Sequence, residues 1–446
     1  MTAPASMTES ITDVTRWVLG TDPLEVPSVD RAARHLLLDT LGCTIAGLDK
    51  PELVELERGL ARFDEGSIRM VGMQRSLSVT AAAYLLGMAA TWDEACEGLA
   101  RAHGRPGLHA FPVAVVLTLA TGGTLGDALR ALVRGYEVGG RLGERLRIRP
   151  GMHVDGTWGT FAGVMAAGSV LGLDADHTMR AIEAGACQTP FSLYHPVKQG
   201  ATIRNSYVAE AGSRAIRLAL AVEAGVTTPH GSLELYDELA LAGTAQDEIA
   251  PPGEWLVEQG YLKPFAAVRH VHYGAEAARL WHGQHRGQAD QIESLVLEVY
   301  PEAVVYCANR APDTAIQAQF SLTYGVARML LHGDLGPDAY SDEALADPEV
   351  RRLERLVEVR TASGERSHER RAGLRVGTAC GPESMMVVDS VTGDLDHPMA
   401  RTELVEKFRR YTGSRLKLGP RTSMPLVDAI LDGPADQPLV SILAER

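Results

Sequence analysis

The sequence has few cysteines, no excess of positive charge and no long apolar run, and each of these absences argues against a class of protein. The five cysteines stand singly, without C-x-x-C pairs or the spacing of a zinc site. A formal net charge of -14 argues against nucleic-acid or anionic-membrane partners, although a local cationic pocket stays possible. No segment has about 18 uninterrupted apolar residues, and the N-terminus lacks a basic region followed by an apolar stretch. We expect a cytoplasmic protein with free thiols, no metal and no membrane span.

The alternation typical of strands is nearly absent before residue 262. Apolar residues recur instead at helical spacing, and small residues among them favour close helix contacts. The first helix is expected after a polar segment of about 25 residues, with Ser28 or Asp30 as its N-cap. The predicted helices cover residues 31–47, 80–92, 110–120, 124–139, 164–173, 177–186 and 209–225.

The pattern changes after Lys263. Residues 292–299, 356–361 and 371–376 alternate as strands do, and residues 318–331 between them read as a helix. Helical character returns at 398–411. The sequence therefore predicts a mainly α protein: a large all-helical domain of residues 1–262 with 398–446, and a smaller α+β lid domain of residues 263–397.

Two glycine-bearing stretches gather residues that could carry chemistry. Residues 151–163 read GMHVDGTWGTFAG, with His153 able to exchange a proton near neutral pH. The alternative is a helix start capped by Asp155 or Thr157, with His153 satisfied in the loop. Residues 93–109 run from the acidic turn at Asp93 through a basic loop before the next apolar helix, so acidic, histidine and arginine side chains stand together there.

In their order along the chain, several segments resemble the MmgE/PrpD family. They are RAARHLLLDTLGCTIAG at 31–47, the acidic turn at Asp93, RPGLHAFP at 105–112, GYEVGGRLG at 135–143, MHVDGTWGTFAG at 152–163, IRNSY at 203–207, KPFAAVRHVHYGAEAA at 263–278, QFSLTYGVA at 319–327 and GDLDHPMARTELVEKF at 393–408. The resemblance implies an active site in a cleft between the two domains, a homodimer, and no metal or organic cofactor. It also implies removal of a proton next to a carboxylate.

The resemblance assigns roles to single residues. His153 falls on the family's motif histidine and is the expected general base or acid. Asp93 would orient a histidine or hold a substrate group, and Lys263 matches a lysine expected to act at the site or anchor a carboxylate. The remaining candidates each have a structural alternative and are Thr157 as a hydroxyl donor or a cap, Arg269 as a substrate contact, His272 as a contact or an orienting residue, and Tyr324 as a cleft hydroxyl or a core residue.

The sequence departs from the family pattern at two positions. Arg105 stands where dehydratase and decarboxylase members usually have histidine, with His103 and His109 on either side, and His109 is the better replacement. Arg204 stands where those members commonly have lysine. An arginine holds a carboxylate with two prongs but cannot carry a proton at neutral pH, so Arg204 is expected to bind rather than catalyse.

The sequence therefore predicts a cofactor-free enzyme acting on a small anionic substrate, a polycarboxylate or an amino-acid-derived acid. A lyase of the dehydratase or decarboxylase type is the simplest reading. An epimerase or isomerase of the iminodisuccinate epimerase type is the alternative, favoured by Arg105, His109 and Arg204. A catalytically silent small-acid-binding protein is the third reading, since two expected site positions are substituted.

Overall fold

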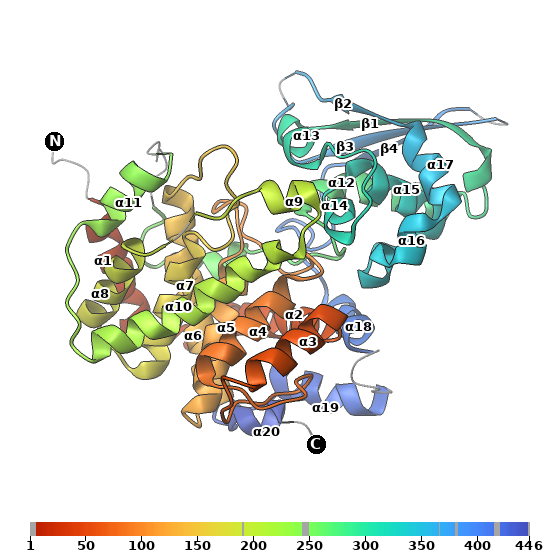
Figure 1. Ribbon diagram of the computed structural model, residues 1–446. Coiled ribbons are helices and arrows are strands. Elements are labelled where there is room, and N and C mark those ends of the chain that lie inside the picture. The colour runs from red at the N-terminus through yellow and green to blue at the C-terminus, as the bar shows by residue number, and fades with distance from the viewer. Residues whose placement is uncertain are drawn as a thin grey trace.

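Helices make up most of the chain. The structure is a computed structural model, and it describes residues 6–189, 191–242, 249–364, 366–379, 382–413 and 420–444. These residues form twenty α-helices and one four-stranded sheet (Figure 1). This arrangement confirms the prediction of a mainly α protein with a smaller α+β part.

The larger, helical part is built from both ends of the sequence. Its helices before the sheet are α1 (Met7–Gly20), α2 (Pro27–Leu48), α3 (Pro51–Ala61), α4 (Val79–Thr91), α5 (Pro106–Ala120), α6 (Leu125–Arg145), α7 (Gly159–Leu171), α8 (Ala175–Ala186), α9 (His195–Gln199), α10 (Ser206–Glu223) and α11 (Ser232–Ala240). After the sheet come α18 (Arg401–Thr412), α19 (Pro420–Leu431) and α20 (Leu439–Leu443). Among the residues that the structure describes, no helix is long and apolar enough to cross a membrane.

Two helices at the N-terminal end correct the sequence-based expectations. Helix α1 lies inside the segment predicted to be only polar, and Ser6 starts it by a capping box with Glu9. Helix α2 begins at Pro27 without a side-chain cap, so the predicted cap at Ser28 or Asp30 is wrong. Proline suits this first position because its fixed φ is helical and its missing N–H would have had no partner there.

Small residues let the long helices approach closely. Gly47 of α2 faces Ala89 of α4, and Gly139 of α6 faces Ala162 of α7. A Cβ on Gly47 would lie 2.1 Å from the Ala89 carbonyl oxygen, and a Cβ on Gly139 would lie 2.5 Å from the Ala162 Cβ. The glycine and alanine positions noted in the sequence are therefore places where helix backbones touch.

Replacing Gly47 by alanine is expected to lower the free energy of unfolding by about 1–3 kcal/mol, because the backbone carbonyl of Ala89 cannot yield to the added methyl group. The matched control is Gly59→Ala in α3, where no heavy atom lies within 4 Å of the added carbon. There, the better helix propensity of alanine should raise stability by about 0.5–1 kcal/mol. Urea unfolding of both variants checks the pair, and equal changes would contradict the close-contact argument.

The smaller part holds the sheet. Its helices are α12 (Arg269–Gln284), α13 (Pro301–Cys307), α14 (Ala315–Gln319), α15 (Leu322–His332), α16 (Asp342–Ala346) and α17 (Pro348–Leu356), and its strands are β1 (Ile292–Val299), β2 (Val357–Thr361), β3 (Ala372–Thr378) and β4 (Ser384–Val388). The strand order is β2-β1-β3-β4, with β1 and β2 parallel and the other pairs antiparallel. In Figure 1, α12 and α15 lie beside this sheet.

The sequence predicted three of these strands closely but missed the fourth and merged two helices. Strand β4 reads SMMVV, whose four consecutive apolar residues carry no period of two. The helix predicted over residues 318–331 is interrupted at Phe320. The Ser321 hydroxyl then accepts a hydrogen bond from the Tyr324 N–H at 3.2 Å and starts α15.

The described residues form two large hydrophobic cores and a small third cluster of Val197, Ile316 and Phe320. The larger core draws its side chains from residues 7–257 and 399–443. The second is formed mainly by residues 265–391, but it also includes Cys43, Cys96 and Leu108 from the helical part. Where the chain passes between the parts, the Leu262 N–H donates to the Gly393 carbonyl at 3.3 Å. The domain limits at 263 and 397 remain a prediction, and the cores meet across an interface beside this crossing.

Candidate active site

A cavity of about 280 Å³ is lined by side chains from both parts of the molecule. Its wall is built mainly from the loops before α5 and α7 and the segment leading into α12, and the link between β2 and β3 adds Arg370. The charged and hydrogen-bonding side chains that line it are Glu94, His103, Arg105, Arg147, His153, Asp155, Trp158, Tyr194, Arg204, Tyr261, Lys263, Arg269, His270, Glu302, Tyr306 and Arg370. The predicted residues His103, Arg105, His153, Arg204, Lys263 and Arg269 are therefore brought together.

The loop before α7 is held in place from two sides. The His153 N–H donates to the Ser192 carbonyl at 2.6 Å, which ties this loop to the segment before α9. Gly156 adopts a φ of 82°, and a Cβ there would lie 3.0 Å from the Tyr207 carbonyl oxygen. Only glycine fits such a left-handed, crowded position. The glycine noted in the motif therefore sets the path of the loop that carries His153.

Thr157 and Asp155 do not cap the helix that follows. The Thr157 hydroxyl donates to the Val154 carbonyl at 2.6 Å, and the side chain is buried outside the cavity lining. Helix α7 begins at Gly159 without a side-chain cap. The alternative that either residue is a helix cap is wrong, and Asp155 instead forms an ion pair with Arg105.

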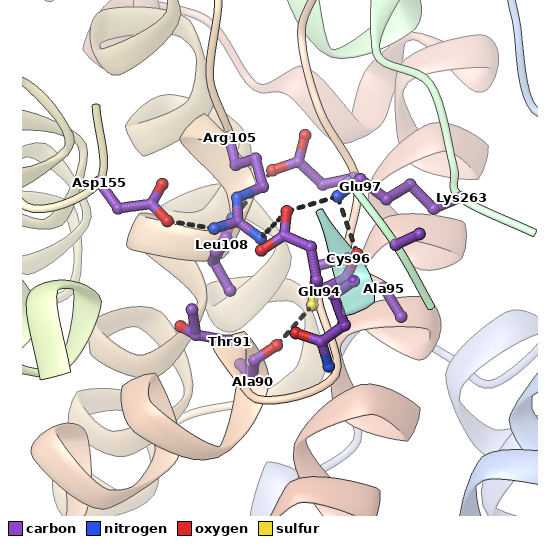
Figure 2. Close-up of polar contacts among 12 residues, drawn as sticks. Ala90, Thr91, Glu94, Ala95, Cys96, Glu97, Arg105, Leu108, Asp155 and Lys263 are labelled. Carbon is purple, nitrogen blue, oxygen red and sulfur yellow. Dashed lines mark hydrogen bonds and ion pairs between the residues drawn. The ribbon is translucent and has the colours of Figure 1, made fainter. Parts of the chain in front are cut away.

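Glu94 binds three cations in the interior. Its Oε1 accepts from the Lys263 Nζ at 2.8 Å and lies 3.1 Å from the Arg105 Nη1, and its other oxygen pairs with Arg204. Asp155 closes the cluster from the far side of Arg105 and lies 3.4 Å from the Arg204 Nη2. Figure 2 shows Arg105 between the carboxylates of Glu94 and Asp155. All five side chains are buried.

The charges of this cluster leave one cation uncompensated. Burial alone would raise the pKa of the Glu94 carboxyl, but Arg105, Arg204 and Lys263 together hold that pKa well below its usual range. Asp155 is likewise kept ionised against burial, chiefly by Arg105. Two carboxylates thus balance two permanently charged guanidinium groups. Burial lowers the pKa of Lys263 against the pull of Glu94, so Lys263 is the member that can lose its charge.

His153 presents a neutral ring to the cavity. Burial, reinforced by Arg204 and Arg105 and opposed by Asp155, lowers its pKa to about 4. The Asp155 N–H donates to the His153 Nδ1 at 3.0 Å. A neutral imidazole has one acceptor nitrogen, so this bond places the proton on Nε2. The Arg204 Nε–H also approaches the His153 Nε2, at the longer distance of 3.5 Å. A neutral ring cannot accept at both nitrogens, and with the shorter bond at Nδ1 kept, the Nε2 carries the proton and can donate to an oxygen in the cavity.

His103 and Arg269 also line the cavity, the first largely exposed and the second buried. His103 has a φ of 52°, and its Nδ1 lies 3.9 Å from the Glu302 Oε1. The Arg269 guanidinium forms an ion pair with Asp394 and lies over the Tyr261 ring at 4.5 Å. Its charge is therefore already compensated, which favours a positioning contact over a free anion clamp.

Asp93 lies outside the cavity lining. Its carboxylate is buried and forms an ion pair with Lys50, at 3.0 Å from the Nζ. The neighbouring Glu94 occupies the cavity instead, at a φ of 51° that turns consecutive acidic side chains to different sides. Sequence reasoning chose the wrong member of this pair of carboxylates for the cavity, because a left-handed glutamate leaves no signature in the sequence.

His109 also lies behind the cavity rather than in its wall. Its Nδ1 hydrogen-bonds to the Arg105 carbonyl at 2.8 Å, and its Nε2 accepts from the Gly156 N–H at 3.1 Å. Both ring nitrogens are thus engaged with backbone groups, and no lone pair remains for a substrate. We therefore do not include His109 among the proposed catalytic residues. Its role is to hold together the loops before α5 and α7.

Tyr324 and His272 occupy structural positions as well. The Tyr324 hydroxyl donates to the Ala339 carbonyl within the second core. The His272 Nε2 donates to the Ala267 carbonyl at 3.0 Å, while its Nδ1 contacts the Arg269 Nη1 at 3.3 Å. Neither side chain lines the cavity. His272 therefore orients the segment that carries Arg269, which was the structural alternative for it.

Several lining residues were missed from sequence. Glu94 and Asp155 lie within the two glycine-bearing stretches, residues 93–109 and 151–163. Their acidic side chains were the signal that could have identified them. His270 lines the cavity, stacks on Tyr306 at 5.5 Å, and has a pKa lowered to about 4 by burial. Its Nδ1 lies 2.6 Å from the hydroxyl of Tyr300. Nothing in the local pattern distinguishes His270 from His272.

The fold and the cavity together define a class of protein: a mainly helical chain with a smaller α+β part and a buried cluster of arginine, lysine and carboxylate side chains where both parts contribute. Residues 12–246 match the MmgE/PrpD N-terminal domain, and residues 265–427 match the MmgE/PrpD C-terminal domain. The chain belongs to the MmgE/PrpD family. Among the described residues, no three His, Cys, Asp or Glu side chains form a group that could hold a metal ion.

Named relatives are similar to this protein over most of its chain. A cis-aconitate decarboxylase of Aspergillus terreus is 24% identical, over 90% of this chain and 89% of its own. A 2-methylcitrate dehydratase of Cupriavidus necator is 26% identical over the same shares. The mitochondrial 2-methylcitrate dehydratase of Yarrowia lipolytica is 24% identical, over 87% of this chain and 81% of its own. The similarity therefore spans both parts of the fold rather than one shared segment.

Proposed function

We propose that this chain is a lyase that acts on a small polycarboxylate or an amino-acid-derived acid. The observation that carries the proposal is the buried cluster around Glu94, in which burial lowers the pKa of Lys263 and the neutral His153 lines the same cavity. The names of the relatives, a decarboxylase and dehydratases, support the same class of reaction. Both reactions need a proton carrier and stabilisation of negative charge next to a carboxylate.

Arg105 holds the substrate carboxylate in this proposal. The Arg105 Nη1 is buried and has no hydrogen-bond partner among the described residues, although it lies near Glu94. Leaving a buried donor without a hydrogen bond costs free energy, so a carboxylate oxygen that accepts from it would stabilise the complex. Glu94 and Asp155 hold the Arg105 guanidinium group in place. The N–H groups of Arg204 are already directed at protein acceptors, which are His153, Thr91, Asn205, Glu94 and Asp155, so in this proposal Arg204 orders the cluster rather than binding the substrate.

Lys263 is the proposed proton carrier. In a dehydration, Lys263 first releases one proton to solvent. Its amine then takes the proton next to the carboxylate, and the electron pair of the broken C–H bond forms the double bond. The C–O bond breaks, and the Lys263 ammonium gives the proton to the hydroxide, which leaves as water. In a decarboxylation, the C–C bond breaks, carbon dioxide leaves, and the Lys263 ammonium protonates the remaining carbon.

His153 serves as a hydrogen-bond donor in both reactions. Its Nε2–H points to the negative charge that develops on the carboxylate when the neighbouring carbon loses a proton or carbon dioxide. A ring with a pKa of about 4 stays neutral at pH 7, and a fixed neutral donor stabilises such charge without moving a proton. This role is narrower than the general base or acid expected from the sequence.

Proton NMR in deuterated water tests the proposal. The panel is cis-aconitate, 2-methylcitrate, citrate, iminodisuccinate and aspartate, each with wild type and with His153→Ala. A new product that lacks water or carbon dioxide, formed slowly or not at all by the variant, is the expected result. Deuterium uptake without loss of a group would replace the lyase by an epimerase. Binding without exchange for every acid would contradict proton chemistry and leave a silent binder.

A further inference from the structure

Arg370 is a cavity cation that contacts neither the cluster of Glu94 and Asp155 nor Asp394. It belongs to the link between β2 and β3, two residues before the start of β3, so the smaller part of the molecule contributes it. Within the described part of the chain, no hydrogen bond or ion pair reaches its guanidinium group. The other deep cations of the cavity each contact a carboxylate: Arg105, Arg204 and Lys263 contact Glu94, and Arg269 contacts Asp394.

The surroundings of Arg370 do not neutralise its charge. The groups that interact with it electrostatically are Tyr261, Tyr273, Tyr300 and Glu302. Phenols are neutral at pH 7. The Glu302 carboxylate lies 3.9 Å from the His103 Nδ1, and it acts on Arg370 only through space, without an ion pair. Arg370 is only partly exposed, and a partly buried charge without a partner is stabilised when an anion arrives.

Arg370 and the cluster around Lys263 line the same cavity of about 280 Å³. The cluster around Lys263 is built mostly on the helical part, through Glu94, whereas Arg370 precedes a strand of the sheet. We propose that Arg370 binds the second carboxylate of the substrate, the one that does not react. It would thereby select acids with two or more carboxylates over those with one. The inference rests on the proposed function for the position of the reacting carboxylate.

Calorimetric titration with succinate and butyrate tests this role, since the two acids share a four-carbon chain and differ in one carboxylate. Wild type is expected to bind succinate more tightly. Arg370→Gln should weaken succinate binding roughly 10- to 100-fold and leave butyrate within about twofold, as a charge-assisted contact predicts. Arg370→Lys should fall between, because it keeps the charge and loses the fork.

The matched control is Arg371→Gln, since this neighbouring side chain pairs with Asp389 at 3.2 Å and does not line the cavity. It should behave as wild type. Equal weakening of both acids by Arg370→Gln, the same loss in Arg371→Gln, or a wild type without preference for succinate would overturn the inference. This test measures binding and not turnover. If the variants bind as expected but the NMR experiment shows no proton exchange, the role of Arg370 stands and the lyase proposal fails. Once a substrate has been identified, Arg370→Gln should raise its KM far more than it lowers kcat.

Discussion

Replacing Lys263 by arginine is expected to lower kcat about 100- to 10,000-fold while substrate binding changes only a few-fold. Arginine keeps the positive charge beside Glu94, so the carboxylate still meets a cation. It cannot release a proton at neutral pH, however, so the proposed transfer to and from the substrate carbon stops. Turnover of the acid identified by NMR, together with calorimetric binding of the same acid, separates these two effects.

Two further variants make the Lys263 experiment decisive. Lys263→Met removes both the charge and the proton carrier, so binding and turnover should both fall. His153→Gln keeps an N–H donor near the same place and should lose less activity than His153→Ala, as expected for a donor that moves no proton. If Lys263→Arg retained most of its kcat, the proton carrier would be a different residue, and His270 would be the next to test.

Replacing Glu94 by glutamine is expected to lower the free energy of unfolding by about 3–5 kcal/mol, the usual cost of removing one partner from a buried ionic group. The carboxylate contacts Arg105, Arg204 and Lys263, and all of them are buried. Without it, Asp155 alone would face three cations. Urea unfolding at pH 7 measures the loss.

The control for Glu94 is Glu254→Gln at the surface. Glu254 pairs with Arg101 at 2.6 Å, but both side chains are more than a third exposed, at 37% and 40%. Exposed pairs contribute about 0–1 kcal/mol, so this variant should be nearly neutral. Adding Lys263→Met to Glu94→Gln should recover part of the lost stability by removing one unpaired cation. A change below about 1 kcal/mol in Glu94→Gln would contradict the view of Glu94 as the centre of the cluster.

Much of the helical fold could be predicted because its signal is local. Apolar residues at helical spacing marked α2 and α4 to α8, and alternation marked β1 over Ile292–Val299. The signal failed where neighbours in space decide. The run SMMVV became a strand only because β3 lies beside it, and the helix predicted over 318–331 broke where Ser321 could cap a new one.

The candidate site divides in the same way. The family-like stretches brought His153, Lys263 and Arg204 into view, and these side chains do meet in one cavity. His109 and Tyr324 looked equally suitable in the sequence. Their polar atoms are instead used by backbone groups, which only the folded chain supplies. A side chain's chemical type can be read from sequence, but whether its lone pairs and protons are free depends on contacts from distant segments.

The sequence by itself determined the helical character, the smaller α+β part and the family, because periodic patterning and ordered motifs are properties of the chain. Only the tertiary structure decided which acidic residue reaches the cavity. Asp93 and Glu94 are adjacent and chemically alike, yet the left-handed backbone at Glu94 sends its carboxylate to three cations and leaves Asp93 with Lys50. Only the fold, likewise, gives the cluster one positive charge more than its carboxylates balance, the charge of Lys263. This excess arises because carboxylates and guanidinium groups from four separate segments are brought together.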